Sequence, residues 1–544
     1  MMQDNSNLTV LVIDPNPGMR GSLQNMLNMS NISKIEFVVS SGTAIRQLSR
    51  KSYDIILCEY DLDNGGEHGQ DGQQLLEDLR HHKLIGRGAI FIMLTSEGVY
   101  SKVVSAAELA PTDYILKPFT VDVLMQRITR AVERRNVFLP TYQLIEQDRI
   151  REAIRSCTDA EMAHPRHAAD FVRMRAELHV SLNEFPQAEH LYNAMLGIKQ
   201  VGWASLGLAR ALFAQGRTDE AETVLTQLVS ANPKLMAAYD LLAKCHEASG
   251  AAGRAQQVLE EAVSISPHMV RRLRHLGEVA LDAGDMTAAE KSFKQVVTKA
   301  KYSEFRDPED HVNLVRTLVK KGDAVQASGV IRDLERSMRG NPNVDVCKAI
   351  SVAMLHEAAG NSAAAASELN NAVGAVRASS GLSSKLRIGL AESCLAHRLD
   401  QEASEVMLSV MNDAGSGVST QQAMSIFVKA GRPDLADGMG AQLKAQAQIL
   451  LGVAAEKANM GDVKGAVQSL LEAMHMSPGN LQVMIAVAKG ILRQLGELGW
   501  DHPLAAVCQA QMEKIHKIDA AHPQLELLNN EYTALKRKYG IAAA

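Results

Sequence analysis

Three fragments of similar outline decide the fold of most of this chain: AQGRTDEA at 214–221, EASGAAGRA at 247–255 and DAGDMTAA at 282–289. Their glycines, Gly216, Gly250 and Gly284, lie 34 residues apart, and an alanine follows each of them five residues later. Glycine permits the positive φ of a tight turn between two helices. The alanine lets the second helix press closely on the first. Small residues that repeat every 34 positions predict stacked helical hairpins.

The pattern continues on both sides of these fragments. A small residue in the first helix stands twelve positions before each alanine, as Ala209 does before Ala221. Met424 is bulky for that position, and Ala423 beside it is one residue out of phase. We expect an array of about nine repeats over 171–500, followed by capping helices over 501–544. The nine candidate hairpins are marked by Ala176 with Ala188, Ala209 with Ala221, Ala243 with Ala255, Gly277 with Ala289, Val315 with Ala327, Ala353 with Ala365, Ala391 with Ala403, Met424 with Ala436, and Ala454 with Ala466.

These hairpins resemble the tetratricopeptide repeat (TPR) family. The resemblance implies a right-handed superhelix in which the first helix of each hairpin lines a groove that binds protein segments. Trp and Arg dominate binding hot spots because they bury large areas and make charge-assisted hydrogen bonds. The alternatives are that Trp203 packs at the start of a hairpin and that the charged residues form a solvated face. Residues expected to face the groove include Trp203, Arg210, Phe213, Asp240, Lys244, Arg271, Arg274 and Arg316.

Composition narrows the class of protein. Aromatic residues make up only 4% of the 544 residues, which favours helix over sheet for most of the chain. The net charge of −5 gives no general signal for nucleic-acid binding. No signal peptide and no apolar run of about 18 residues is found, so we expect a cytoplasmic protein without membrane insertion. The six cysteines are scattered, which predicts buried free thiols.

The first 137 residues follow a different pattern. Short apolar runs alternate with helical segments near 17–29, 42–50, 71–82, 98–109 and 120–135. Such alternation predicts an α/β domain with a doubly wound, five-stranded parallel sheet covered on both faces. Strand carboxyl ends meet at one edge of such a sheet, where ligands bind. The runs are LTVLVID at 8–14, KIEFVV at 34–39, YDIILCE at 53–59, AIFIMLT at 89–95 and DYILKP at 113–118, and they bring Asp14, Glu59, Thr95 and Lys117 to that edge.

FIMLTSEG and DYILKPF in this region resemble the response-regulator receiver domain, the flavodoxin-like phosphoacceptor half of bacterial two-component signalling. The resemblance implies a switch threonine at Thr95, a switch aromatic at Tyr114 and the active-site lysine at Lys117. In the family, a pair of acids after the first strand binds Mg²⁺, and an aspartate that ends the third strand accepts phosphate. This chain has Asp14 followed by Pro15, and Glu59 in place of the acceptor aspartate.

These departures predict a degenerate receiver with little or no phosphorylation. Mg²⁺ needs near-octahedral oxygen geometry, and phosphoryl transfer depends on positioning. We therefore expect no metal or cofactor, Asp14 and Glu59 being the residues that remain for Mg²⁺. Glu59 is expected to reach toward Lys117 and Thr95. The alternatives are phosphorylation at Asp61 or Asp63, and an Asp14–Lys117 ion pair that only supports the fold.

Residues 138–170 are expected to be a helical junction that leads into the first repeat. Pro140 predicts a stop in the preceding helix, and the lack of a Gly/Ser run predicts a short hinge. Arg130, Arg134 and Arg135 form a basic run. A solvated helix end explains such a run, and nucleic-acid contact is the alternative.

These observations together predict a non-catalytic signalling adaptor of the two-component type. An atypical receiver would regulate the protein, dimerise or dock a signalling protein, and the TPR groove would bind a protein partner. No phosphate-binding, metalloprotease or nucleophile-elbow motif is present, so we expect no enzyme. Two alternatives remain open: a phosphorelay response regulator switched by phosphorylation with TPR output, and a nucleic-acid-binding regulator that uses Arg130–Arg135 and Arg271–Arg274.

Overall fold

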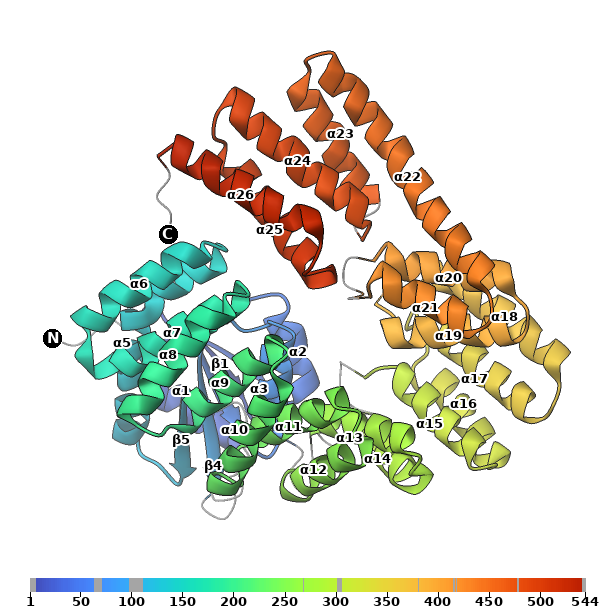
Figure 1. The fold of residues 1–544 in the computed structure, drawn as a ribbon. Helices are drawn as coiled ribbons and strands as arrows, with labels where there is room; N and C mark the ends of the chain where they lie inside the picture. Colours follow the sequence, from blue (N-terminus) through green and yellow to red (C-terminus); the bar gives the residue numbers. More distant parts are fainter. Residues whose placement is uncertain are drawn as a thin grey trace. The chain divides into compact units, whose positions relative to one another are not determined.

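The computed structural model describes residues 6–62, 71–96, 111–267, 269–300, 306–379, 381–413, 416, 418–476 and 479–540. The helix expected near 98–109 and Asp63 lie outside these residues. The chain divides into two compact units, Met1–Thr317 and Leu318–Ala544. The first unit holds an α/β domain and the first helical hairpins, and the second unit is entirely helical (Figure 1).

The α/β domain is a five-stranded parallel sheet in the order β2-β1-β3-β4-β5, as the sequence predicts. Successive residues of β1 face opposite sides. Val10 and Val12 pack with helices α1 and α5, whereas Leu11 and Ile13 pack with α2 and α3. The strands are β1 (Thr9–Ile13), β2 (Lys34–Val38), β3 (Ile55–Glu59), β4 (Ile90–Ser96) and β5 (Asp113–Lys117), and the helices are α1 (Pro17–Asn28), α2 (Ser41–Leu48), α3 (Gly72–His81) and α5 (Val121–Glu146).

Helix α5 does not stop at Pro140, so the predicted hinge is wrong. It runs for 26 residues, from the sheet to the helical array, with Pro140 inside it. An internal proline costs a helix about 3 kcal/mol, and packing on either side offsets that cost. Phe138 packs against Phe171 with ring centroids 4.5 Å apart and the rings tilted by 32°, and the Thr141 hydroxyl lies 2.8 Å from that of Ser156. The last helix of the α/β domain is therefore also the first helix packed against the array.

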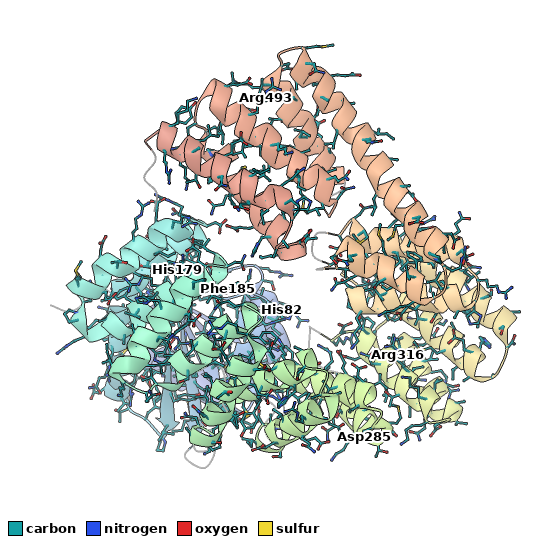
Figure 2. All side chains as sticks on the ribbon, viewed as in Figure 1. His82, His179, Phe185, Asp285, Arg316 and Arg493 are labelled. Carbon is teal, nitrogen blue, oxygen red and sulfur yellow. The ribbon has the colours of Figure 1, made fainter. Side chains whose placement is uncertain are left out.

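The repeats form the predicted antiparallel hairpins. Gly216, Gly250 and Gly284 occupy the turns with φ of 77°, 73° and 84°. Asn183 and Arg398 take the same turn position with φ of 59° in two other hairpins, which is why the glycine pattern is incomplete there. In the first hairpin His179 and Glu184 also bridge the turn, 2.7 Å apart, next to Phe185 at the start of α8 (Figure 2).

The helices of the array in the first unit are α6 (Ile150–Ala163), the short η1 (Pro165–His167), α7 (Ala168–Ser181), α8 (Phe185–Ile198), α9 (Gly202–Ala214), α10 (Thr218–Ala231), α11 (Met236–Ala248), α12 (Ala252–Ile265), α13 (Val270–Ala283), α14 (Met286–Ala300) and most of α15 (Glu309–Lys320). The marker alanines Ala221, Ala255 and Ala289 are fully buried. A larger side chain at these positions would force the paired helices apart.

The second unit continues the pattern with one exception. Helix α22 runs unbroken for 27 residues and carries both Ala436 and Ala454, so two of the expected hairpins share it (Figure 1). Ala423, rather than Met424, is fully buried. The remaining helices are α16 (Ala324–Ser337), α17 (Val344–Ala358), α18 (Ser362–Val376), α19 (Ser384–Ala396), α20 (Asp400–Met411), α21 (Thr420–Lys429), α22 (Pro433–Asn459), α23 (Val463–Met476), α24 (Leu481–Leu498), α25 (His502–Ile518) and α26 (Pro523–Lys538). All six cysteines lie in the described part of the chain, are buried and form no disulfide, as predicted.

Candidate functional site

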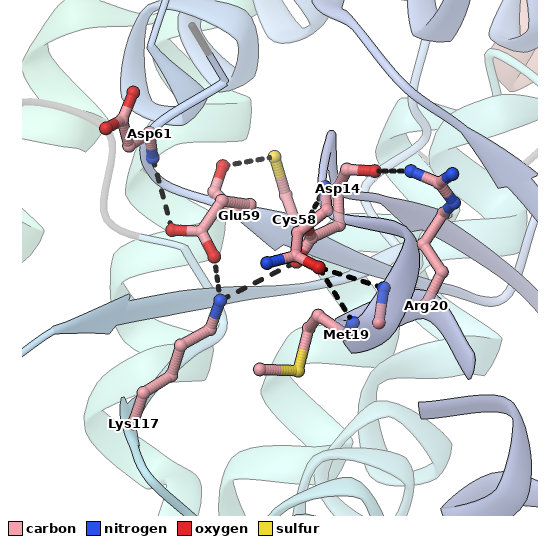
Figure 3. A network of polar contacts seen from close by, with 9 residues as sticks. Asp14, Met19, Arg20, Cys58, Glu59, Asp61 and Lys117 are labelled. Atoms are coloured by element: carbon pink, nitrogen blue, oxygen red, sulfur yellow. Dashed lines mark hydrogen bonds and ion pairs between the residues drawn. The ribbon is translucent and has the colours of Figure 1, made fainter. Parts of the chain in front are cut away.

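The carboxyl edge of the sheet brings together three of the predicted residues, Asp14, Glu59 and Lys117 (Figure 3). Asp14 follows β1 and is 1% exposed. One of its carboxylate oxygens accepts a hydrogen bond from the Asn16 amide at 2.7 Å, and its carbonyl accepts one from Arg20 at 2.6 Å. The other carboxylate oxygen lies 3.6 Å from the Lys117 ammonium. Asp14 is thus held in place by the turn that begins α1.

Glu59 makes the direct contact with Lys117. The ammonium donates a hydrogen bond to one Glu59 carboxylate oxygen, while the other oxygen accepts from the Asp61 amide at 3.2 Å. The Lys117 and Glu59 side chains are only 22% and 12% exposed. One ammonium is therefore shared by two carboxylates in a partly desolvated place, where charge pairs are stronger than at the surface.

Thr95 and Tyr114 lie on neighbouring strands of the same sheet. Thr95 is buried near the end of β4, and Tyr114 on β5 is half-buried. Tyr114 packs on the side of the sheet that α2 and α3 cover, next to Tyr60. Their predicted role as switch residues remains a prediction, since their positions agree with both a switch and simple packing.

Sequence reasoning missed Gly72 and Asp71, which shape this edge from the start of α3. A β-carbon at Gly72 would lie 2.5 Å from the Glu59 carbonyl oxygen, so only glycine fits there. Asp71 caps α3 by accepting a hydrogen bond from the Gln74 amide at 2.7 Å. Burial raises the pKa of Asp71 to about 6. The D-x-x-Q pattern at 71–74 is typical of a capping box, and it is the signal from which this helix start could have been predicted.

The edge fits Mg²⁺ poorly. Among the described residues, no group of three or more His, Cys, Asp or Glu side chains gathers in a way that could hold a metal ion. Asp14 and Glu59 both already face the Lys117 ammonium. Mg²⁺ requires several oxygens in near-octahedral geometry, and the second acid that would supply one is replaced by Pro15.

In the array, three cations predicted to face the groove act on the carboxylate of a fourth predicted residue, Asp240. Burial raises the pKa of Asp240 on α11, and the positive charges of Lys244, Arg271 and Arg210 each act on it in the opposite direction. These residues come from α11, α13 and α9, the first helices of three successive hairpins. Asp240 also accepts two hydrogen bonds from Arg272, at 2.9 and 3.0 Å. Asp240 thus joins α11 to α13 through Arg272, and the assignment of these residues to a partner-binding groove stays a prediction.

The other predicted groove residues lie elsewhere. Trp203 packs edge-on against Tyr192, at 6.4 Å between ring centroids, and Phe213 adjoins the same buried cluster. Arg274 forms a bidentate ion pair with Asp310 on α15, at 2.5 and 2.8 Å. Arg316 is half-buried on α15 (Figure 2). Their role in binding a partner stays a prediction.

Comparison with known proteins identifies the two regions. Residues 10–129 match the response regulator receiver domain family, and residues 199–245 match the tetratricopeptide repeat family. The chemotaxis protein CheY-3 of Vibrio cholerae is 24% identical over 130 residues, which cover 24% of this chain and 95% of that protein. The chemotaxis protein CheY of Pseudomonas aeruginosa is 24% identical over 129 residues, covering 24% of this chain and 99% of that protein.

A tetratricopeptide repeat protein from Parabacteroides merdae is among the similar solved structures. It is 15% identical, covers 55% of this chain and 97% of its own, and has a TM-score of 0.33. The chain thus carries a response regulator receiver domain over 10–129, followed by TPR repeats. In the part of the chain that the structure describes, no helix has the length and apolar character needed to cross a bilayer.

Proposed function

We propose that this protein is a non-catalytic bacterial signalling adaptor that acts in the cytoplasm. Its receiver domain holds one signalling state without a phosphorylation cycle, and its TPR groove binds a protein partner. The observation that carries this proposal is the Glu59–Lys117 ion pair at the carboxyl edge of the sheet. Glu59 stands at the acceptor position with a longer side chain than aspartate, and its carboxylate is already bonded to the Lys117 ammonium.

The chemistry of the edge supports this reading. Glutamate is one methylene longer than aspartate, which moves its carboxylate by roughly one bond length. Phosphoryl transfer relies almost entirely on in-line positioning and on metal charge. The chain has lost one metal-binding acid and altered the acceptor, so both requirements are weakened together.

Helix α5 supports a structural link between the receiver and the array. Its first half packs on the sheet through Leu124 and Ile128, and its second half packs on α6 and α7 through Phe138. Arg134 reaches Asp170 on α7 at 3.2 Å. We therefore expect a shift of the receiver sheet to move the first repeat with it, because one continuous helix packs on both. The receiver would also offer a docking face for a signalling protein or a second receiver.

The alternative of a phosphorylation-switched regulator is tested by mass. The full chain is incubated with Mg²⁺ and acetyl phosphate, and its intact mass is recorded. We expect no gain for the wild type. As the matched control, Pro15→Asp combined with Glu59→Asp restores both missing acids and should acquire a phosphoryl group. A stoichiometric gain in the wild type that Glu59→Gln abolishes would overturn the proposal, and a gain that survives Glu59→Gln would point to Asp61 or Asp63.

The nucleic-acid alternative receives less support from the structure. Two arginines of the basic run are neutralised, Arg134 by Asp170 and Arg135 by Asp54. Cations that are already paired release few counterions on binding a phosphate backbone. Arg272 and Arg274 are likewise paired with Asp240 and Asp310. A steep fall of nucleic-acid affinity with rising salt would restore this alternative.

A further inference from the structure

Three cations on the first helices of successive hairpins form no ion pair with a carboxylate that the structure describes. Arg210, Lys244 and Arg271 are exposed, and they lie near one another around Asp240. Arg210 and Lys244 make no ion pair or hydrogen bond with any residue that the structure describes, and Arg271 contacts only the imidazole of His81. The carboxylate of Asp240 is already engaged by Arg272. We name Arg210, Lys244 and Arg271 the basic groove.

Two of these cations follow the repeat. Arg210 and Lys244 are 34 residues apart, so they occupy the same position in consecutive hairpins, on α9 and α11. The next equivalent position holds Glu278, and Arg271 comes instead from the start of α13. The neighbouring Arg272 and Arg274 each form a bidentate ion pair with an aspartate. Cations on three successive first helices suit an extended or helical segment rather than a small ion.

Part of the basic groove faces the receiver of the same chain. His81, at the end of α3, lies 3.1 Å from the Arg271 guanidinium, measured between ring and guanidinium nitrogens. Further along α3, Glu77 and Gln73 are 4% and 8% exposed. Burial raises the pKa of Glu77 to about 7, and the charges of Arg271 and Arg272 act against that rise. At the start of the helix, Lys299 on α14 acts in the same way on Asp71. One flank of α3 therefore lies against α13 and α14.

We infer that the basic groove binds an acidic segment of a partner protein, and that α3 of the receiver masks its Arg271 end. This inference rests on the proposed function, since it specifies the chemistry of the partner that the TPR groove takes. Arg210 and Lys244 are open to the partner, whereas Arg271 becomes available when α3 moves away. Charge complementarity of this kind sets partner choice and the rate of association.

Binding of a defined peptide to the full chain tests the groove. The probe is a fluorescein-labelled peptide of alternating Glu and Ala, and its affinity is measured by anisotropy at low salt. Arg210→Glu with Lys244→Glu should weaken binding at least about tenfold, because two attractions become repulsions. The control, Lys234→Glu with Lys291→Glu, makes the same change in net charge at two exposed positions outside the groove. Equal losses in both double variants, or no binding by the wild type, would overturn the inference.

The masking by α3 is tested with the same probe. His81→Arg places a like charge beside Arg271 at an exposed position, so it should open the contact and tighten peptide binding by about threefold or more. Lys83→Arg, two residues further on, adds no charge and should bind as the wild type does. As a second measurement, a short bismaleimide linker joins cysteines introduced at His81 and at Val270, which adjoins Arg271 and leaves that cation in place, while the native cysteines remain buried. Linked protein should bind the peptide less well than the same unlinked variant.

Unchanged affinity in both His81→Arg and the linked protein would overturn the masking. These results are independent of the mass experiment above. Phosphorylation of the wild type would contradict the proposed receiver state but not the basic groove. Failure of the peptide to bind would contradict the basic groove but not the proposed receiver chemistry.

Discussion

The receiver edge and the basic groove treat their charges in opposite ways. At the edge, the Lys117 ammonium is shared by two buried or nearly buried carboxylates. In the groove, Arg210 and Lys244 form no ion pair with a carboxylate among the described residues. A site whose charges are satisfied internally gains little from a ligand, because a ligand must displace an existing partner. The comparison supports our proposals that the array binds the partner and that the receiver edge has a structural or state-setting role.

The largest effect is expected from breaking the link between the two regions. Phe138→Ala removes a fully buried ring from the contact of α5 with α7 and should cost about 4 kcal/mol of stability in this part of the chain. Hydrogen exchange should show lost protection in α6 and α7 while β1 and β3 keep theirs. Val137→Ala, on the same turn at a half-buried position, is the milder control. Equal loss of protection throughout the sheet would show that α5 does not separate the two regions.

The second prediction concerns the carboxyl edge of the sheet, where Lys117 is paired with two carboxylates. Lys117→Met removes the one cation that serves Asp14 and Glu59, and should destabilise the receiver by about 3 kcal/mol, since a buried carboxylate is then left without its partner. The measurement is hydrogen exchange of the β1 and β3 amides. Glu59→Gln, which leaves Asp14 paired with Lys117, should cost clearly less. A cost below about 1 kcal/mol for Lys117→Met would mean that water already satisfies this edge.

The third prediction is a pH dependence at the boundary between the two regions. Burial raises the pKa of Glu77 from 4.5 to about 7. A raised carboxyl pKa means that the folded state holds the proton more tightly than the unfolded state. The stabilising contribution is therefore complete below about pH 4.5 and is lost as the pH rises through 7, with a slope of at most about 1.4 kcal/mol per pH unit.

Other groups that face Glu77 also contribute to this pH dependence. Gln73 donates to it at 3.1 Å, Asp71 opposes its ionisation, and Arg271 and Arg272 favour it. Burial lowers the pKa of the nearby His81. The contribution of His81 to the free energy of unfolding therefore rises with pH below its ordinary pKa, opposite in sign to the contribution of Glu77. Glu77→Gln should abolish the loss between pH 5 and 7 in the protection of α3 amides. An identical pH profile in the variant and the wild type would contradict the assignment to Glu77.

The smallest effect is expected in the groove itself. Arg210→Glu with Lys244→Glu changes exposed side chains without partners, so the unfolding free energy should move by less than about 0.5 kcal/mol. The thermal midpoint of the full chain measures this, alongside the loss of acidic-peptide binding. A large drop in the midpoint would mean that these cations support the array, and the contrast with the receiver edge would fail.

The sequence predicts the regular parts of this molecule well. Both folds follow from periodic signals, the alternation of apolar runs for the sheet and the 34-residue spacing of Gly216, Gly250 and Gly284 for the array. The convergence of Asp14, Glu59 and Lys117 follows from the topology of a parallel sheet. These features depend on local or repeated interactions, which a linear pattern records.

The failures come from contacts between segments far apart in the chain. Pro140 normally ends a helix, but packing of Phe138 on Phe171 keeps α5 continuous. The ion pair of Arg274 with Asp310, 36 residues later, also has no signal in the sequence. The contact of His81 with Arg271 joins positions 190 residues apart and has no signal in the sequence. Which charges remain open for a partner is therefore known only from the structure.

Acidic-peptide binding measured with and without Mg²⁺ and acetyl phosphate tests the central claim most directly. The account predicts the same affinity in both conditions for the wild-type full chain, since the receiver edge is closed by its own charges and the groove is the binding surface. A change in affinity that acetyl phosphate induces in the wild type and that Glu59→Gln abolishes would contradict it, and would make this protein a phosphorylation-switched regulator.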